Sequence, residues 1–502
     1  MVTRGLWNLR VDGKWYRSFN PPRGRITSPN TPATLQAIRK IIQETSVNSW
    51  EPVPFPTPLH IDLDYVYNID KDSGILTITQ WDGVEGVLTR LVRQAKLSEV
   101  QDSSLATIEV ILKTVEDFPI QHNTQHDQTQ SSAALKVDIG TPTSLNELQF
   151  RLFTDLVLLW KFYFDDVASW SHEPFLKTLA IGILRIAAWD FEVLLDTDTA
   201  EIPIKFYSVP SWSVPSGNIF WFHGFLVTLY SATELVDNAI LKAKSFLDKD
   251  QCTENHARVI LISLSHVTLV EINGTCIMRS STIPLVVNSS ALHPSPGFRV
   301  LASILSSYSW NIRDHKETWE INLPTELFDR ILKSLVPKDI MSFAQASFTV
   351  EKWYYSSLPQ LNGLHVQSFD FSIPCCGKQF QPNIDSVYCS SCYVWSHKKC
   401  VGLACEIKED GYICSECRQN KTCTILETGG IYGAYRKRKS RSGCQVAING
   451  VRKTLHLRLG KPASRRPELW LIRGMSVPPK TINYTIYFSG VFSGLAYGID
   501  EA

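Results

Sequence analysis

The residues best suited to chemistry lie between positions 375 and 417, where eight of the chain's twelve cysteines fall within 43 residues. Seven of these cysteines and one histidine form four ligand pairs, which in chain order are Cys375 and Cys376, Cys389 and Cys392, His397 and Cys400, and Cys414 and Cys417. Two thiolates spaced as Cys-x-x-Cys bind one tetrahedral Zn²⁺ ion. Four pairs therefore predict two zinc ions, and zinc modules of this size bind partners more often than they catalyse reactions.

The first pair departs from this spacing, because Cys375 and Cys376 are adjacent. Neighbouring side chains on an extended backbone point in opposite directions, so one ion binds both only where the chain turns sharply. Alternatively, one of the two binds with another ligand, for which Cys405 is the spare cysteine of the cluster. The sequence leaves both arrangements open.

The order of four cysteines, one histidine and three cysteines resembles a plant homeodomain (PHD-type) finger over about Ile373–Gln419. Trp395, two residues before His397, and the Val-Gly-Leu that follows Cys400 also agree with that family. A RING finger, the alternative, usually carries its histidine as Cys-x-His in the middle of the motif. The resemblance implies a cross-brace, in which the first and third ligand pairs bind one zinc ion and the second and fourth pairs bind the other.

The resemblance also implies a binding surface. Many such fingers bind histone tails and hold methylated lysine in an aromatic cage through cation–π attraction. Trp395 stands at the position of the cage tryptophan, and Phe380 is the candidate for a second wall. Ser386 and Ser390 stand where methyl-lysine readers often carry a methionine and an acidic residue. We therefore expect a protein–protein surface or a structural clip, with histone-tail reading as the alternative.

A helical segment precedes the finger. Pro324 suits a first helical turn, where its missing N–H is not needed, and Glu326 suits the positive end of the helix dipole. An apolar stripe follows at helical spacing, formed by Leu327, Ile331, Leu332 and Leu335. Pro337 ends this helix and can open a second one, which has Asp339 in its first turn, and Val350, Trp353 and Tyr354 predict a third.

Over about 40 residues this segment resembles an F-box, through Leu-Pro-x-Glu-Leu, Ile-Leu-x-x-Leu, Asp-Ile and Phe-Ala-x-x-Ser. In that family the helices dock on the Skp-type adaptor of cullin-RING ubiquitin ligases. An ordinary helical bundle is the alternative. The positions that would either dock on the adaptor or form the bundle core are Leu323, Pro324, Leu327, Ile331, Leu335 and Ile340.

Charge is distributed unevenly, although the whole chain carries only +1. From residue 418 onward there are 15 Lys and Arg against 4 Asp and Glu, a net of +11, which leaves −10 for the first 417 residues. The compact basic run is Arg436, Lys437, Arg438 and Lys439. Such a run predicts nuclear import or nucleic-acid contact through phosphates, with a solvated charged loop as the alternative.

The residue patterns predict an α+β multidomain protein with a mixed N-terminal domain and a β-rich basic C-terminal region. The two resemblances imply a three-helix F-box-like bundle and a cross-brace zinc finger between them. The expected segments are an extension over 1–55, a mixed α/β domain over 56–310 with a flexible insert near 118–143, F-box-like helices over 320–360, the finger over 372–420 and the basic region over 421–502.

Within these segments the residue patterns predict individual elements. Helices are expected near Pro32–Glu44, over Val84–Val115, over Leu145–Leu195 and over Asn218–Leu247. Alternation predicts a hairpin over His60–Trp81 with one buried face, and strands over Arg258–Leu285 that turn at Asn273-Gly274. Further strands are expected over Val446–Leu459 and Asn483–Phe492.

Several function classes are not expected. The sequence has no signal-peptide core and no run of 18 apolar residues, which predicts no membrane segment and no secretion. The cysteines outside the cluster are too sparse for a disulfide framework, so the nucleus or cytoplasm is expected. Phosphate-loop, nucleophile-elbow and zinc-protease motifs are missing, which predicts no enzyme.

Taken together, these patterns predict a non-catalytic adaptor. The F-box-like helices would recruit a ubiquitin ligase, and the finger would bind a substrate or another partner. The alternative is a nuclear, chromatin-associated reader that binds histone tails or DNA.

Overall fold

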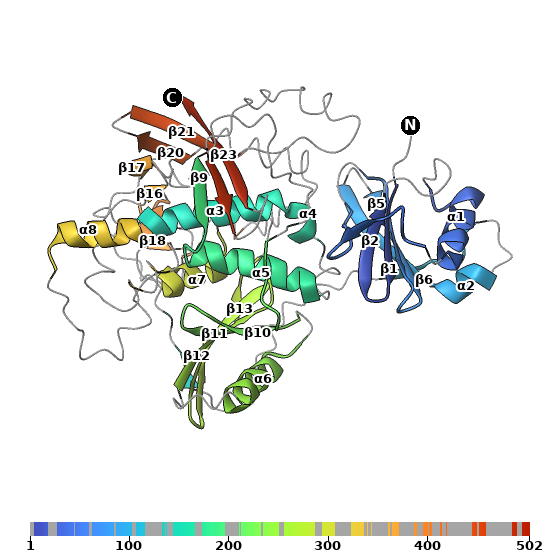
Figure 1. Ribbon diagram of the computed structural model, residues 1–502, viewed down its shortest axis with the longest axis horizontal. Coiled ribbons are helices and arrows are strands. Elements are labelled where there is room, and N and C mark those ends of the chain that lie inside the picture. Colours follow the sequence, from blue (N-terminus) through green and yellow to red (C-terminus); the bar gives the residue numbers. More distant parts are fainter. Residues whose placement is uncertain are drawn as a thin grey trace. The chain divides into compact units, whose positions relative to one another are not determined.

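The structure is a computed structural model of the chain. It describes residues 5–18, 28–44, 46–59, 63–84, 87–102, 107–115, 133–135, 137, 144–164, 166, 173–195, 210, 212–231, 234–249, 256–286, 294–306, 323–335, 339, 343, 360–361, 364–370, 386–388, 395–399, 401–403, 412–413, 418, 444–448, 451–457, 484–488 and 494–501. These residues are mixed α and β, as expected, and form two compact units (Figure 1). Unit 1 is drawn from Met1–Thr129 and Lys161–Phe175, and unit 2 from Gln130–Trp160, Leu176–Thr424 and Ile431–Ala502.

Unit 1 contains a seven-stranded sheet in the order β3-β2-β1-β4-β5-β6-β7. Its neighbouring strands are antiparallel except for the parallel pair β1 and β4. The strands are β1 (Gly5–Val11), β2 (Lys14–Ser18), β3 (Glu51–Val53), β4 (Tyr65–Asp70), β5 (Ile75–Val84), β6 (Val87–Lys96) and β7 (Lys113–Val115). The first 55 residues, expected as an extension, thus supply three strands of this sheet.

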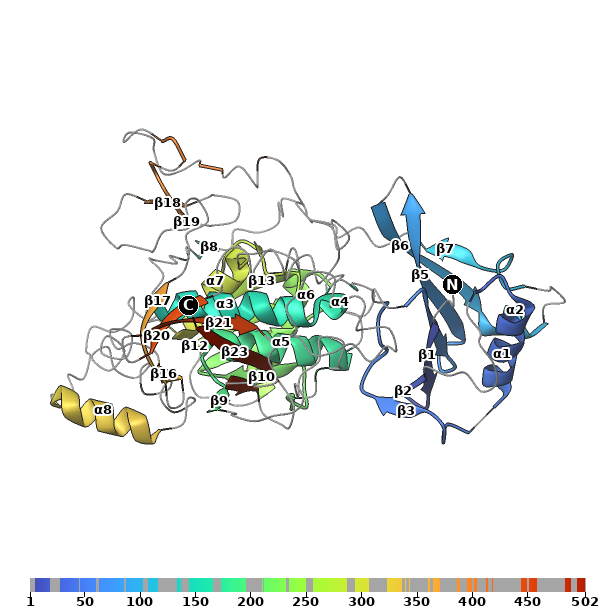
Figure 2. The ribbon, with the colours of Figure 1, turned by 90° about the horizontal axis from the view of Figure 1, so that it is seen from above.

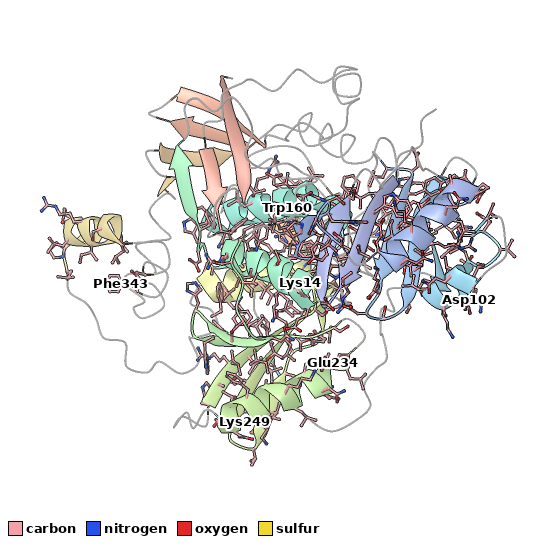
Figure 3. All side chains as sticks on the ribbon, turned by 45° about the vertical axis from the view of Figure 1, so that its right-hand side comes forward. Lys14, Asp102, Trp160, Glu234, Lys249 and Phe343 are labelled. Carbon is pink, nitrogen blue, oxygen red and sulfur yellow. The ribbon has the colours of Figure 1, made fainter. Side chains whose placement is uncertain are left out.

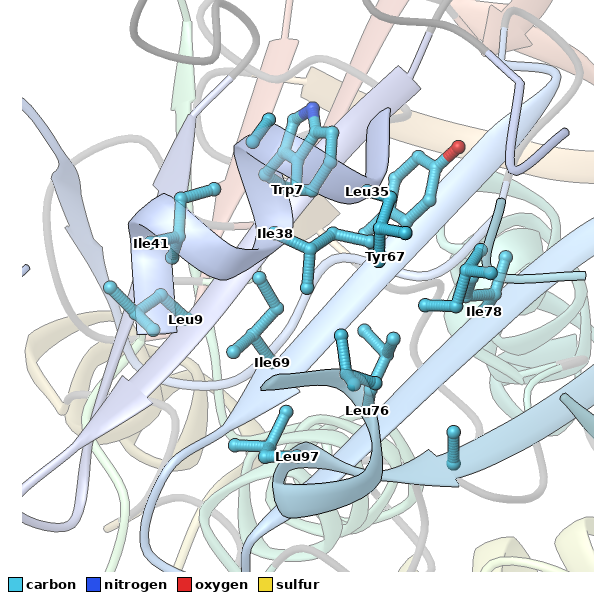
Figure 4. Close-up of a cluster of buried hydrophobic side chains, with 14 of the residues drawn as sticks. Trp7, Leu9, Leu35, Ile38, Ile41, Tyr67, Ile69, Leu76, Ile78 and Leu97 are labelled. Carbon is cyan, nitrogen blue, oxygen red and sulfur yellow. The ribbon is translucent and has the colours of Figure 1, made fainter. Parts of the chain in front are cut away.

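Two helices, α1 (Pro32–Gln43) and α2 (Leu97–Asp102), cover one face of the sheet (Figure 4). The expected start of α1 is confirmed, because Thr31 caps the helix through Thr34 N–H and Pro32 follows at the first helical position. Leu35, Ile38 and Ile41 then point into a core shared with Trp7, Leu9, Tyr67, Ile69, Leu76 and Ile78. The helical spacing of these apolar residues is what fixes α1 on the sheet.

The hairpin expected over His60–Trp81 is present as β4 and β5, but the expectation of one buried face was wrong. On the face opposite to α1, Val66 packs with Leu6, Leu59 and Leu63 in a second small core. In the Asp70–Gly74 turn, Asp70 Oδ1 accepts hydrogen bonds from the backbone N–H groups of Asp72 and Ser73, and the turn is also bonded to the β1–β2 turn. The Asp72 carboxylate accepts hydrogen bonds from the backbone N–H groups of Asp12 and Gly13, at 3.0 and 2.8 Å.

The helix expected over Val84–Val115 was also wrong, because the segment forms β6, α2 and β7. Val92 and Arg93 are adjacent in β6 and both are buried, at 8% exposed. A strand covered on both faces loses the alternation by which a strand is recognised. The same reason explains the error over Asn218–Leu247, where β10 (Ile219–Phe222) and β11 (Phe225–Leu229) precede α6 (Val236–Lys249), and every residue of β11 is buried.

Unit 2 contains a sheet in the order β10-β11-β12-β13-β14-β8, with β15 beside β13. The strands not yet given are β8 (Ala133–Ala134), β12 (His256–Ile262), β13 (His266–Asn273), β14 (Cys276–Arg279) and β15 (Ile283–Pro284). The strands and the Asn273-Gly274 turn expected over Arg258–Leu285 are confirmed, since Asn273 pairs with Cys276 and Gly274 has φ +59°. Side chains fill the space between this sheet and α6, which ends at Lys249 (Figure 3).

The helices not yet given include α3 (Ser144–Leu159), α5 (Glu173–Ala187) and α7 (Pro296–Ser306). The short α4 (Lys161–Phe164) follows α3. Within unit 2, Gln149 of α3 donates its side-chain amide to the last carbonyls of α5, Ile186 O and Ala187 O, at 3.0 and 2.7 Å. These carbonyls have no partner within the helix, so the glutamine side chain caps it. Among the described residues, no helix is long and apolar enough to cross a membrane.

A third sheet joins distant parts of the chain in the order β16-β17-β20-β21-β23-β22-β9. Its strands are β9 (Glu192–Leu195), β16 (Gln360–Leu361), β17 (Leu364–Asp370), β20 (Cys444–Ile448), β21 (Val451–Leu457), β22 (Tyr484–Tyr487) and β23 (Leu495–Glu501). The expected C-terminal strands are thus present. They share one sheet with β9, which lies within the expected 56–310 segment.

The chain leaves this sheet after β17 and returns to it at β20, which is the strand next to β17 (Figure 1 and Figure 2). The two strands are antiparallel, and Asp370, the last residue of β17, is paired with Gln445 near the start of β20. Residues 371–443, which include the finger and the basic run, are therefore an insertion whose two ends start from neighbouring strands.

Candidate metal centre and docking helix

The finger contains a short hairpin around its second cysteine pair. β18 (Ser386–Tyr388) and β19 (Trp395–His397) are antiparallel, with Ser386 opposite His397 and Tyr388 opposite Trp395. The connection between them is residues 389–394, so Cys389 follows β18 directly and Cys392 lies in the same connection. A hairpin holds the ends of its connection together, which favours chelation of one ion by both thiolates.

The third ligand pair flanks a tight turn that follows β19. Lys398 O accepts a hydrogen bond from Leu403 N–H at 3.0 Å, and Lys399 O accepts one from Gly402 N–H at 3.4 Å. Gly402 has φ +70°. This is the Schellman arrangement that ends a helical turn, in which glycine adopts the left-handed conformation without strain. His397 and Cys400 are three residues apart at this turn, a spacing at which two ligands reach one ion.

The candidate metal ligands lie mostly outside the described residues. This holds for Cys375, Cys376, Cys389, Cys392, Cys400, Cys414 and Cys417, for the spare Cys405, for Phe380 and for the basic run Arg436–Lys439, while His397 and Trp395 are described only as part of β19. No group of three metal-ligating side chains is found among the described residues. The hairpin and the turn lie beside the second and third candidate ligand pairs, which the expected cross-brace assigns to two different zinc ions.

The first helix expected before the finger is present as α8 (Thr325–Ser334). Pro324 stands one position earlier than expected, at the N-cap, and its carbonyl accepts a hydrogen bond from Leu327 N–H at 3.0 Å. Glu326 lies in the first turn, where its charge favours the helix dipole. Asp339 and Phe343 of the expected second helix are helical, while Ile340 and the expected third helix lie outside the described residues.

Exposure differs along the apolar stripe of α8. Leu332 is buried at 6% exposed, and Ile331 and Leu335 are half-buried. Leu323 and Leu327, at the start of the helix, are 38% and 42% exposed. Leu327 lies in the first turn of α8, and Leu323 precedes the N-cap Pro324, so both exposed leucines lie at the N-terminal end of the helix. The described leucines of this segment therefore include a buried one, Leu332, and two exposed ones, Leu323 and Leu327.

No role was expected for residues 1–310, and in the structure a row of residues with buried polar atoms crosses the sheet of unit 1. Trp7, Tyr67 and Arg93 lie on the same face of three strands and are buried at 0%, 0% and 8% exposed. The alternation over His60–Asp70 was the available signal, because it places Tyr65 and Tyr67 among apolar core positions. Arg93 had no comparable signal in the expected helix.

Comparison with protein families, with curated proteins and with solved structures finds no match to this chain. The functional argument therefore depends on the residues, their spacing and the described geometry.

Proposed function

We propose that the chain is a non-catalytic adaptor that recruits substrates to a cullin-RING ubiquitin ligase through its F-box-like helix α8. The observation that carries this proposal is the pair of exposed leucines, Leu323 and Leu327, at the start of an amphipathic helix. Large apolar side chains exposed together at the N-terminal end of an amphipathic helix are typical of a segment that docks on a partner.

Co-precipitation with the Skp-type adaptor tests the proposal. The wild-type chain should bind, and Leu323→Ala/Leu327→Ala should weaken binding by more than about tenfold, because two apolar anchors are removed. Leu241→Ala is the matched control, since Leu241 is 62% exposed on α6, in another part of unit 2. No association of the wild-type chain, or equal association of all three, would contradict the ligase proposal.

The finger would serve this adaptor as the module that holds a second protein. Zinc bound by its four ligand pairs would fix the hairpin and the Schellman turn in one arrangement, because a segment of this size has too little apolar area to fold alone. The finger starts and ends at the neighbouring strands β17 and β20, which anchor it to unit 2 at both ends.

Zinc stoichiometry tests the finger. We expect about two zinc ions per chain, about one in Cys389→Ser, and no change in Cys276→Ser, which replaces an exposed free thiol outside the cluster. Loss of one ion in both Cys375→Ser and Cys376→Ser would make both residues ligands. Loss in only one of them would favour Cys405 as the remaining ligand. A chain without bound zinc would contradict the proposal.

A second candidate function is a nuclear reader of histone tails. Its supporting observation is that Trp395 of β19 is paired with Tyr388 of β18, which places two aromatic residues at the pair that closes the hairpin. This function predicts binding to histone peptides that Trp395→Ala abolishes, and nuclear import that depends on Arg436–Lys439. A peptide array without hits would exclude it.

A further inference from the structure

We draw no further inference here: the strongest candidate, the outer edge of strand β10 in unit 2 with the exposed side chain of Trp221, carries nothing because nothing in the structure shows what covers it.

Discussion

Unit 1 and the proposed finger differ in what is expected to stabilise them. The sheet of unit 1 is covered on one face by α1 and α2 and packs a second core on the other, so apolar burial stabilises it. Among its described residues, the proposed finger has a hairpin of two three-residue strands and one helical turn. Its sequence contains eight candidate metal ligands. The proposed function therefore predicts that one chain combines a core-stabilised scaffold with a module whose fold depends on an ion.

The largest difference between the two regions is expected when zinc is removed. Structural zinc contributes about 10–16 kcal/mol in isolated fingers, far more than any side chain in unit 1. Treatment with a chelator should therefore abolish amide protection over residues 386–403 and leave protection over residues 65–84 unchanged. Hydrogen–deuterium exchange with mass spectrometry measures both segments in one sample. Equal loss of protection in the two segments would show that unit 1 also depends on the metal.

The reverse experiment acts on the core of unit 1. Leu76 is fully buried between α1 and the sheet, and Leu76→Ala should lower the free energy of unfolding of unit 1 by about 2–5 kcal/mol. Zinc stoichiometry should stay at the wild-type value. Ile75→Ala is the matched control, because Ile75 is the preceding residue of β5 and is 36% exposed. Loss of zinc in Leu76→Ala alone would link the two parts of the chain.

The two regions also differ in how far sequence reasoning could predict them. The helix Pro32–Gln43 and the hairpin at Asn273-Gly274 were predicted because capping residues, helical spacing and turn residues are local signals. Strand β6 was missed because Val92 and Arg93 are buried on opposite faces, which depends on contacts distant in sequence. The pairing of β17 with β20 and of β9 with β22 has no local signal at all.

For the candidate functional residues, those of the proposed finger could be predicted from the sequence and those of unit 1 could not. Metal-ligand spacing is a local pattern, so the cysteine pairs could be identified without a structure. The polar row of unit 1 was not identified, because Trp7, Tyr67 and Arg93 are 60 and 26 positions apart and meet only through strand register. Residues that act together and lie close in the sequence can be identified from their spacing. Residues that a sheet brings together can be identified only once the strand order and register are known.

The smallest expected effects come from substituting two glycines, one in the proposed finger and one in unit 1. Gly402 ends the Schellman turn of the proposed finger at φ +70°, and Gly74 lies in the β4–β5 turn at φ +71°. A Cβ atom added at either position would meet no described atom within 4 Å. Alanine at either position costs about 1 kcal/mol, because a side chain disfavours this conformation. Gly402→Ala should weaken zinc binding several-fold and leave the unfolding of unit 1 unchanged, while Gly74→Ala should do the opposite. Competition with a zinc-binding dye and chemical denaturation measure the two effects. Since both substitutions impose the same local strain, a difference in readout can come only from what each turn supports: a ligand pair in the finger, and the register of two strands in unit 1.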